Sequence, residues 1–380
     1  MKKTIALTDI CHMTYAADCS ANERFAATEL KKYLEQITGC NYTLSDDSAP
    51  YRKKEIILGA GNAHLKDCGF VYDSCELKNE GFVIKTCGEN IIIVGGKKRG
   101  LMYGVYTFLE KFCGCRWLAP DCEVVPKNST ISIGEINDIE KPAFEYRESY
   151  FKPVFDNLFL AKLKCNSSKM IPQPDMGGRF LIYPFAHSFN QLVPVDKYFD
   201  SHPEYFSEID GKRIRAHTQL CLTNPDVVDI AVATALEWIK NNPEISAVDL
   251  SQNDCGNPCQ CEKCKAVYER TQSYSGSIIE FANAVAQRVT EVYPDMLFTV
   301  FAYQYSRKAP VNIKAHPHIA VRLCGFECCC VHPVETATCS GTVINGISPT
   351  SCSFKNDVKE WGACCDRLII WSYIVNFLHT

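Results

Sequence analysis

The chain has 380 residues, of which 46% are hydrophobic and 22% charged, and its formal net charge is −4. This balance is typical of a soluble globular protein long enough for two domains, and it argues against a disordered chain. A nucleic-acid-binding protein usually carries a basic face or run, whereas the longest basic cluster here is Lys97-Lys98-Arg99. We interpret this triplet as a solvated turn and expect no nucleic-acid partner.

The N-terminus is basic, but only a short apolar stretch precedes Thr8 and Asp9. A secretory signal needs about 7–15 apolar residues before a small-residue cleavage site. A membrane-spanning helix needs roughly 20 apolar residues. We recognise neither pattern and therefore expect a cytoplasmic protein with no membrane partner.

Cysteine is frequent, with 23 residues, and some of them are adjacent, as in Cys328-Cys329-Cys330 and Cys364-Cys365. Adjacent cysteines fit disulfide geometry poorly, and thiols in the cytoplasm stay reduced. We therefore expect most cysteines to be small apolar residues of the core.

The first 140 residues alternate between β and α patterns. Apolar residues recur at helical spacing from Asn22 to Ile37, before Gly39, and again from Gly100 to Phe112. Short apolar runs predict strands at residues 3–7, 55–59, 81–86 and 90–94, the last two as a hairpin. We expect a small α/β accessory domain over residues 1–140, linked to the next domain through Asp138–Pro142.

From residue 143 the pattern becomes a repetition of strand, loop and helix, which is typical of a parallel sheet and here predicts a (β/α)8-type TIM barrel. Helices are expected at Asp226–Lys240 and Ser275–Tyr293. The expected strands are Phe144–Tyr150, Leu181–Phe185, Gln219–Leu222, Ala247–Ser251, Leu297–Tyr303, Ile319–Cys324 and Arg367–Tyr373. A closed barrel needs eight strands. Seven strands are expected here, so either the eighth lies in a segment that we interpret differently, or the chain is a shortened version of a longer protein. We therefore expect a barrel over residues 143–380 that is incomplete at its C-terminal end.

In TIM barrels the chemistry lies at the carboxyl ends of the strands. The polar residues at these ends are Arg147, Glu148, His187, Asn253, Asp254, Tyr303, Glu327, Ser372 and Tyr373. A glycosidase uses a carboxylic acid to protonate the leaving oxygen and a second group to stabilise the transition state. When the substrate carries an acetamido group, that group can be the nucleophile. The enzyme then needs one acid and a carboxylate or amide that orients the acetamido group.

Glu327 is the candidate acid because it follows the apolar strand IAVRLC and neighbours three cysteines, in surroundings that favour a protonated carboxyl. Every candidate also has a purely structural interpretation. Glu327 could be a surface loop residue, and Asn253-Asp254 could stabilise a turn. His187 could be a core histidine, and Tyr303 could only pack.

The segment CGNPCQCEKC places Cys255, Cys259, Cys261 and Cys264 within ten residues. Four thiolates are a ligand set for tetrahedral zinc. The spacing departs from the usual pair of C-x-x-C arms, so packing without metal remains an alternative. We expect all four cysteines on the loop after the strand at residues 247–251, where they could hold a structural zinc; no cofactor is required for catalysis.

Several motifs resemble those of a known family. Residues 99–126 (RGLMYGVYTFLEKFCGCRWLAPDCEVVP) are similar to the end of the small α/β domain that precedes the barrel in β-hexosaminidases and α-glucuronidases. The motifs that follow, in order, are HSFNQLVP, YFDSHPEYFSEIDGKR, QLCLTNPDV, SQNDCGNPCQCEKC, FAYQYS, VRLCGFECCCVHP and LIIWSYIVNF. Together they resemble the bacterial family long labelled domain of unknown function 4838, which includes endo-β-N-acetylglucosaminidases that act on N-glycans.

This resemblance implies a retaining, acetamido-assisted glycosidase acting on glycans that contain N-acetylglucosamine. By motif position it implies Glu327 as acid/base, Asn253 and Asp254 beside the sugar, and His187 and Tyr303 in the pocket wall. We assign catalytic roles to Glu327 and Asp254.

The strand-end positions add Tyr373 and Arg147 to the predicted substrate-binding residues. The family pattern near the C-terminus is W-D-Y, whereas this chain has Trp371-Ser372-Tyr373 and so lacks a strand-end carboxylate. Family members also continue past the Asn-Phe segment that begins at Asn376.

Two other interpretations follow from these departures and from the cysteines. The chain could be an inactive or carbohydrate-binding relative without turnover, or a zinc-binding protein centred on Cys255–Cys264. Hydrolysis of an aryl N-acetylglucosaminide would distinguish an enzyme from a binding protein, and metal analysis would identify a zinc protein.

Overall fold

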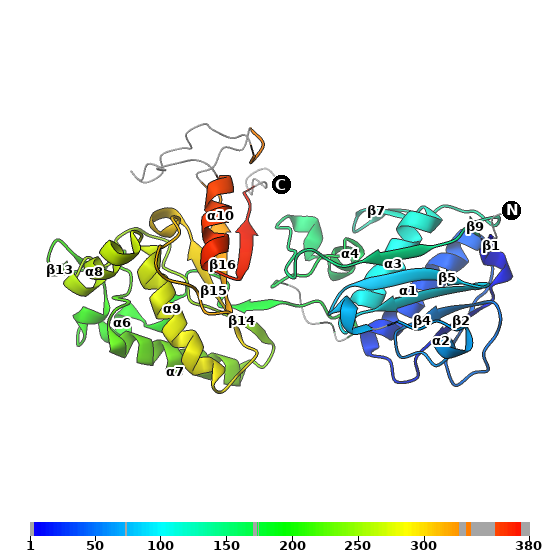
Figure 1. The fold of residues 1–380 in the computed structure, drawn as a ribbon, viewed down its shortest axis with the longest axis horizontal. Helices are drawn as coiled ribbons and strands as arrows, with labels where there is room; N and C mark the ends of the chain where they lie inside the picture. The colour runs from blue at the N-terminus through cyan, green and yellow to red at the C-terminus, as the bar shows by residue number, and fades with distance from the viewer. Residues whose placement is uncertain are drawn as a thin grey trace. The chain divides into compact units, whose positions relative to one another are not determined.

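The structure, a computed structural model, describes residues 4–72, 74–169, 173, 175–326, 332–335 and 354–373 (Figure 1). The chain divides into two compact units, Met1–Arg179 and Phe180–Thr380. This division lies later in the chain than the predicted link at Asp138–Pro142, and the limits 1–140 and 143–380 stay a prediction about domains.

The first unit is built on a six-stranded mixed sheet with the strand order β10-β5-β6-β4-β2-β3. Its strands are β2 (His12–Tyr15), β3 (Thr43–Asp46), β4 (Glu55–Leu58), β5 (Phe82–Cys87), β6 (Asn90–Gly95) and β10 (Asn137–Glu140). Strands β2, β3, β4 and β6 are parallel to their neighbours in this group, while β5 pairs antiparallel with β6 and with β10. The predicted hairpin is thereby confirmed.

The strand predicted at residues 3–7 is only the short β1 (Ile5–Ala6), which pairs with β9 (Ser132–Ile133) outside the main sheet. A further small ribbon is formed by β7 (Arg116–Ala119) and β8 (Cys122–Val124).

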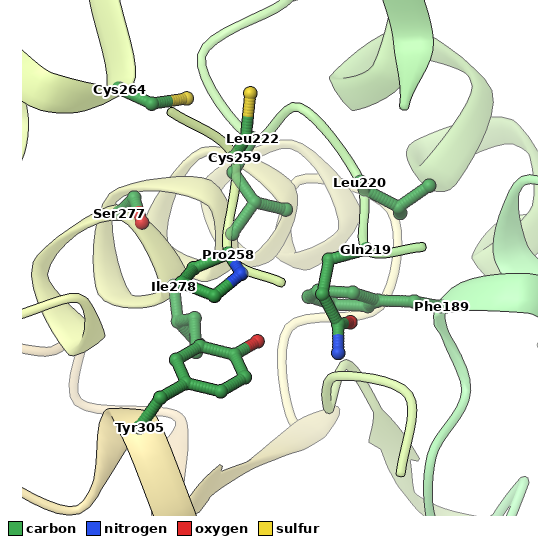
Figure 2. Close-up of a pocket in the computed structure, with 10 residues that line it drawn as sticks. All are labelled: Phe189, Gln219, Leu220, Leu222, Pro258, Cys259, Cys264, Ser277, Ile278 and Tyr305. Carbon is green, nitrogen blue, oxygen red and sulfur yellow. The ribbon is translucent and has the colours of Figure 1, made fainter. Parts of the chain in front are cut away.

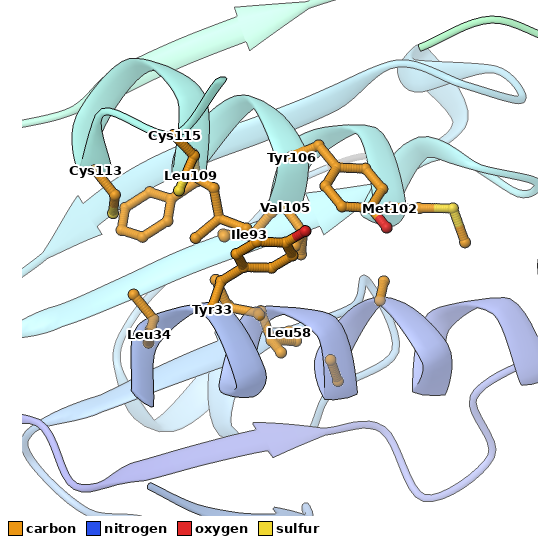
Figure 3. Packing of buried hydrophobic residues seen from close by; sticks show 14 of the residues in the cluster. Tyr33, Leu34, Leu58, Ile93, Met102, Val105, Tyr106, Leu109, Cys113 and Cys115 are labelled. Atoms are coloured by element: carbon orange, nitrogen blue, oxygen red, sulfur yellow. The ribbon is translucent and has the colours of Figure 1, made fainter. Parts of the chain in front are cut away.

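Two helices cover one face of this sheet, α1 (Ala21–Thr38) and α3 (Gly100–Cys113), and both were predicted. The hydroxyl of Ser20 caps α1 by accepting from the backbone N–H of Glu23, whose carboxylate in turn accepts from the N–H of Ser20. Figure 3 shows the core between these helices and the sheet. Its labelled residues are Tyr33, Leu34, Leu58, Ile93, Met102, Val105, Tyr106, Leu109, Cys113 and Cys115.

The opposite face of the sheet is covered by the short helices α2 (His64–Asp67) and η2 (Ser74–Leu77) with the adjoining loops. The second apolar cluster there consists of Ile57, Leu65, Phe70, Leu77, Val83, Ile92 and Val94.

The segment up to Arg179 also belongs to the first unit. It contains η3 (Lys152–Phe155) and α4 (Asn157–Lys162), which add buried apolar residues to the core between α1 and α3. The prediction of a barrel strand at Phe144–Tyr150 is wrong, because this backbone pairs with a loop residue instead of a strand. The N–H of Arg147 donates to Asn166 Oδ1 (2.8 Å), and the N–H of Asn166 donates to the Arg147 carbonyl (3.0 Å).

The second unit contains a five-stranded parallel sheet with the order β11-β14-β15-β16-β17. Its strands are β11 (Leu181–Tyr183), β14 (Ile245–Asp249), β15 (Leu297–Ala302), β16 (Ile319–Cys324) and β17 (Arg367–Trp371). These five coincide with predicted strands. The prediction of a strand at Gln219–Leu222 is wrong: Leu220 makes only an isolated bridge to Phe206. Within the residues that the structure describes, the sheet is not a closed barrel.

Helices α7 (Pro225–Asn241), α9 (Ser275–Thr290) and α10 (Phe354–Cys364) cover one face of this sheet, where their apolar residues pack on Val248, Phe298 and Val321. The shorter elements are α5 (Phe189–Leu192), α6 (Val195–Tyr198), η4 (Pro203–Tyr205), the ribbon β12 (Glu208–Ile209) and β13 (Lys212–Arg213), α8 (Glu262–Thr271) and η5 (Gln304–Ser306). No helix in the described part of the chain is both long and apolar enough to span a membrane.

Candidate functional site

Four aromatic rings line the carboxyl edge of the parallel sheet in the second unit. His187 follows β11, Tyr303 follows β15, Phe326 follows β16 and Tyr373 follows β17. The ring centroids are 6.2 Å apart between His187 and Tyr303, 6.2 Å between Tyr303 and Phe326, and 4.9 Å between Phe326 and Tyr373. We call these four residues the aromatic edge. Because parallel strands bring their carboxyl ends to one side, the predicted residues His187, Tyr303 and Tyr373 do gather there.

The two ring nitrogens of His187 face different groups, a backbone carbonyl and the carboxylate of Asp254. Its Nδ1 lies 2.8 Å from the carbonyl oxygen of Gln252, so Nδ1 carries the proton and donates. Its backbone N–H donates to Ser251 Oγ (2.8 Å), and its φ of 54° is the left-handed conformation. The other nitrogen, Nε2, lies 4.0 Å from Oδ1 of Asp254. With 31% of its side chain exposed, His187 is not a core histidine.

Asp254 follows β14 and presents a carboxylate that is 61% exposed beside His187. An exposed carboxylate next to an imidazole nitrogen can accept hydrogen bonds from a polar ligand at this edge. A ligand here would therefore meet an acceptor, the Asp254 carboxylate, and a ring nitrogen, His187 Nε2, that can form a further hydrogen bond.

Asn253 has a different position. Its Oδ1 accepts from the backbone N–H of Asn190 (3.0 Å), and its Nδ2 donates to the carbonyl of Thr218 (2.9 Å). Its own N–H donates to Oε1 of Gln219 (2.9 Å). Both ends of the amide are thus bonded to backbone, which makes Asn253 a residue that positions the Asp254 loop. The predicted contact of Asn253 with a sugar stays a prediction.

Arg147 lies in the first unit, where its guanidinium binds local partners. Its Nη2 donates to Oε2 of Glu80 (2.7 Å), its Nε to the carbonyl of Lys164 (2.9 Å) and its Nη1 to the carbonyl of Phe144 (2.6 Å). These contacts stabilise the first unit, and the predicted role of Arg147 in substrate binding stays a prediction.

The predicted acid, Glu327, lies outside the described residues, as do Cys328, Cys329 and Cys330. Strand β16 ends at Cys324, and Phe326 belongs to the aromatic edge. The catalytic role of Glu327 therefore remains a prediction.

Sequence reasoning missed a buried ion pair under the aromatic edge. Arg322 of β16 donates to Oδ1 of Asp249 on β14, and the two residues are 1% and 0% exposed. The guanidinium carbon of Arg322 lies 4.3 Å from the ring centroid of Phe301 and 5.6 Å from that of Trp371. The available signal was a charged residue within an otherwise apolar run, AVDL for Asp249 and IAVRLC for Arg322, since such residues are buried only when paired.

The cysteine site differs from its prediction in one member. The sulfurs of Cys221, Cys259, Cys261 and Cys264 all lie within 4.8 Å of one another, and all four residues are buried. Cys255 is not part of this group: its sulfur donates to the carbonyl of Thr218 (3.6 Å). The chain between Cys255 and Cys259 turns through Asn257, whose φ is 62°, and this turn separates the two cysteines.

Cys221 could not be found from local spacing, because it precedes Cys259 by 38 positions along the sequence. It lies in the loop before α7, which Asn224 caps by accepting from the N–H of Asp226. The neighbouring thiols of Cys259 and Cys264 hold the pKa of Cys221 well below its ordinary value, against the effect of burial, and the guanidinium of Arg213 adds to this lowering.

A narrow pocket adjoins the cysteines (Figure 2). Figure 2 shows Tyr305 and Gln219 reaching into it from different sides, with the sulfurs of Cys259 and Cys264 near one another at its far end. The pocket has room for about one water molecule. It is therefore too small for a sugar, and the aromatic edge remains the candidate site.

Comparison with known proteins gives matches to both parts of the chain. Residues 3–108 match the family described as the N-terminus of glycosyl hydrolase family 67. The α-glucuronidase of Hypocrea jecorina is 27% identical over 87 residues, which are 22% of this chain and 10% of that protein. The chain thus matches only about a tenth of the length of this curated relative.

Among solved structures, a family GH115 4-O-methyl-α-glucuronidase with specificity for decorated arabinogalactans has a TM-score of 0.49 and 11% identity, covering 84% of this chain and 45% of that one. The chitobiase of Flavobacterium johnsoniae has a TM-score of 0.47 and 13% identity, covering 85% of this chain and 53% of that one. The chain spans about half the length of these two proteins. Similarities this distant establish neither a shared activity nor a shared substrate.

The second match covers more than half of the chain. Residues 117–380 match the family described as domain of unknown function DUF4838, and they include every residue of the aromatic edge and of the cysteine group. This chain therefore belongs to the DUF4838 family and carries, ahead of that domain, a region like the N-terminus of glycosyl hydrolase family 67.

Proposed function

We propose that the protein is a glycoside hydrolase whose sugar-binding site is the aromatic edge of the second unit. The observation that carries this proposal is the row of rings His187, Tyr303, Phe326 and Tyr373 with the carboxylate of Asp254 beside it. Ring faces pack against the apolar C–H faces of a sugar, while a few convergent polar groups fix its orientation. The match of residues 3–108 to a glycosyl hydrolase N-terminus supports the same class of activity.

Within this class we propose a substrate that carries N-acetylglucosamine and a retaining mechanism assisted by the acetamido group. Asp254 would accept a hydrogen bond from the acetamido N–H and so orient the acetamido carbonyl oxygen. That oxygen attacks the anomeric carbon while Glu327 gives its proton to the leaving oxygen, and an oxazolinium ion forms. Glu327 then takes a proton from water as the water adds to the anomeric carbon, which restores the acetamido group and retains the configuration.

A second candidate is an enzyme that cleaves glucuronosides. It is favoured by the N-terminal match to family 67 and by the 27% identity to an α-glucuronidase over 87 residues. A glucuronoside carries a carboxylate at C6 and has a hydroxyl at C2, where N-acetylglucosamine has its acetamido group. At the aromatic edge, protonated His187 could bind this carboxylate through Nε2, whereas Asp254 would repel it.

The test compares three chromogenic substrates: 4-nitrophenyl N-acetyl-β-D-glucosaminide, 4-nitrophenyl β-D-glucoside and 4-nitrophenyl α-D-glucuronide. We expect cleavage of the first alone, because the glucoside lacks the internal nucleophile. Asp254→Asn should lower kcat on this substrate by about 10²–10³-fold, the usual effect of losing one group that stabilises the transition state.

Asp210→Asn is the matched control, because Asp210 lies exposed in the turn between β12 and β13, and its kcat should equal that of the wild type. Cleavage of the glucuronide alone would favour the second candidate. If no substrate is cleaved but N-acetylglucosamine binds in calorimetry, the protein is a carbohydrate-binding relative without turnover.

A further inference from the structure

We infer that Cys221, Cys259, Cys261 and Cys264 form a four-thiolate zinc site that joins the loop before α7 to the loop before α8. The sulfur of Cys221 lies 3.7 Å from that of Cys261 and 3.9 Å from that of Cys264. A tetrahedral ion with Zn–S bonds of about 2.3 Å requires its sulfurs to be about 3.8 Å apart. The sulfurs are therefore spaced as ligands around one metal ion.

A disulfide does not account for this spacing. Bonded sulfurs are about 2.0 Å apart, and the four cysteines are free thiols in the structure. The residues are 4% to 8% exposed, and together they form an apolar cluster of their own that is separate from the main core. Ordinary packing of thiols would not need four of them to converge from two separate loops.

The surroundings of the sulfurs are those of metal-bound thiolates, which accept several hydrogen bonds. The backbone N–H of Glu208 lies 3.5 Å from the Cys259 sulfur, and Nη1 of Arg213 lies 3.6 Å from it. The hydroxyl of Thr223 lies 3.2 Å from the Cys264 sulfur. Such outer contacts orient the ligands and offset part of the negative charge of four thiolates.

The secondary structure also places two of the ligands at a helix N-terminus. Cys261 is the N-cap residue of α8, and Cys264 lies in the first turn of this helix. The unpaired N–H groups and the dipole of a helix stabilise negative charge at this end. The guanidinium of Arg213, with Nη1 3.6 Å from the Cys259 sulfur, adds a positive charge on another side of the group.

The site has a structural role, because four cysteine ligands leave no open coordination position for a substrate or water. Its role is to fix the loop that carries Asp254. Gln219, two residues before Cys221, donates to the carbonyls of Asn253 (2.9 Å) and Cys255 (2.8 Å). A metal ion that holds Cys221 would therefore hold the Gln219 contacts and the loop from Asn253 to Cys261. This inference does not depend on glycosidase activity.

The experiment compares Cys221→Ser, which removes a proposed ligand, with Cys255→Ser, which changes a cysteine outside the group. The full-length chain is purified under reducing conditions, and its zinc content is measured by plasma mass spectrometry. We expect one zinc ion per chain in the wild type and in Cys255→Ser, and a strongly reduced content in Cys221→Ser. Zinc retained by Cys221→Ser and lost from Cys255→Ser would overturn the assignment, as would a wild type without zinc after purification in zinc-containing medium.

A second measurement does not depend on whether Cys221→Ser folds. X-ray absorption of the wild-type protein should give four sulfur neighbours at about 2.3 Å from zinc and no nitrogen or oxygen neighbour. Replacement of zinc by Co²⁺ should give the intense visible bands of a tetrahedral site. A mixed set of sulfur with nitrogen or oxygen ligands, or bound iron in place of zinc, would overturn the proposal.

Discussion

Arg322 on β16 reaches across β15 to bind Asp249 on β14, so that one ion pair joins two strands that are not adjacent in the sheet. Asp249 also accepts from Oγ1 of Thr299 (2.8 Å) and from Oγ of Ser251 (2.6 Å). Ser251 in turn accepts from the backbone N–H of His187 (2.8 Å). The pair is therefore linked through one hydroxyl to the histidine of the aromatic edge.

Breaking this pair should destabilise the second unit. Arg322→Met removes the guanidinium and leaves the Asp249 carboxylate buried with only neutral donors. We expect a loss of about 3–5 kcal/mol in the free energy of unfolding, as for other buried pairs that lose one partner. Urea unfolding followed by tryptophan fluorescence measures it, since Trp238, Trp361 and Trp371 belong to the second unit.

The double variant Arg322→Met/Asp249→Asn should be more stable than Arg322→Met alone, because it removes the unpaired charge together with its partner. Arg288→Met, which removes the exposed pair with Asp229, is the matched control and should change stability by at most about 1 kcal/mol. Equal losses of unfolding free energy in Arg322→Met and Arg288→Met would show that the buried pair contributes no more to stability than the exposed one.

A second prediction concerns a buried histidine in the first unit. Nδ1 of His64 lies 2.9 Å from Oε2 of Glu55, and its Nε2 lies 2.9 Å from the carbonyl of Ala49. Both nitrogens face acceptors, so the ring is satisfied as a cation. Burial alone would lower the pKa of His64, but the Glu55 carboxylate and the Ala49 carbonyl outweigh it, and the pKa is raised.

Because the pKa is higher in the folded than in the unfolded chain, this pair stabilises the protein fully below the unfolded value of about 6.5. The contribution is lost as the pH rises through the folded pKa. The difference in stability between the wild type and His64→Gln should therefore shrink as the pH rises from about 6.5 upward. A difference that grows over this range would contradict the charged form of His64.

The third prediction concerns the acid of the proposed mechanism. Glu327→Gln should lower the rate by about 10²–10⁴-fold for substrates with a poor leaving group, which need protonation. A nitrophenyl substrate should be affected much less, because its leaving group needs little protonation. The measurement is kcat/KM over a series of aryl N-acetylglucosaminides of different phenol acidity. Equal losses across the series would remove Glu327 from the role of acid.

The fourth prediction concerns the extent of the first folding unit. Arg99, fully buried, donates to the carbonyls of Met176 (2.7 Å), Cys165 (3.0 Å) and Gly177 (2.6 Å). A Cβ at Gly178 would lie 2.0 Å from the Arg99 guanidinium carbon, so only glycine fits beside it. We expect a fragment of residues 1–179 to unfold cooperatively and a fragment of residues 1–142 to remain unfolded in circular dichroism.

Arg99→Lys in the full-length chain provides a milder change at the same point. Lysine keeps the charge but cannot donate in three fixed directions, and each bond lost from a charged donor costs about 1.5–3 kcal/mol. Lys98→Met, one residue earlier on the surface, is the control. Cooperative folding of the 1–142 fragment would contradict the contribution of residues 143–179.

Much of the fold could be predicted from hydrophobic pattern alone. The helices α1, α3, α7 and α9 and the five parallel strands of the second unit were all identified, because each buries a regular apolar face. The strands expected at Phe144–Tyr150 and Gln219–Leu222 are extended or looped instead, since their polar side chains bind neighbouring loops. A short extended run with polar partners has the same pattern as a strand, and only tertiary contacts distinguish the two.

For the candidate site, the sequence predicted only which end of the strands carries it. His187, Asp254, Tyr303 and Tyr373 were predicted as site residues because functional side chains lie at the carboxyl ends of the strands in TIM barrels. The structure places them at one edge of the sheet, and their roles stay predictions. Cys221 was not found as a fourth member of the cysteine group, because the contact depends on how the loop before α7 packs and not on spacing. The pair of Asp249 and Arg322 was missed because the sequence pattern shows a charged residue within each apolar run but not that the two side chains meet across the sheet.

The buried Arg99 limits where recombination can exchange the N-terminal region of such a protein. The two family matches meet between residues 108 and 117, at the end of α3, whereas the first compact unit continues to Arg179. The boundary between the two matching sequences thus lies inside one folded body. A recombination event at that boundary would keep Arg99, which precedes α3, and replace the segment that supplies its three carbonyl acceptors. Descendants of such an exchange could persist only if the segment equivalent to residues 165–178 arrived with the new partner or evolved again beside it.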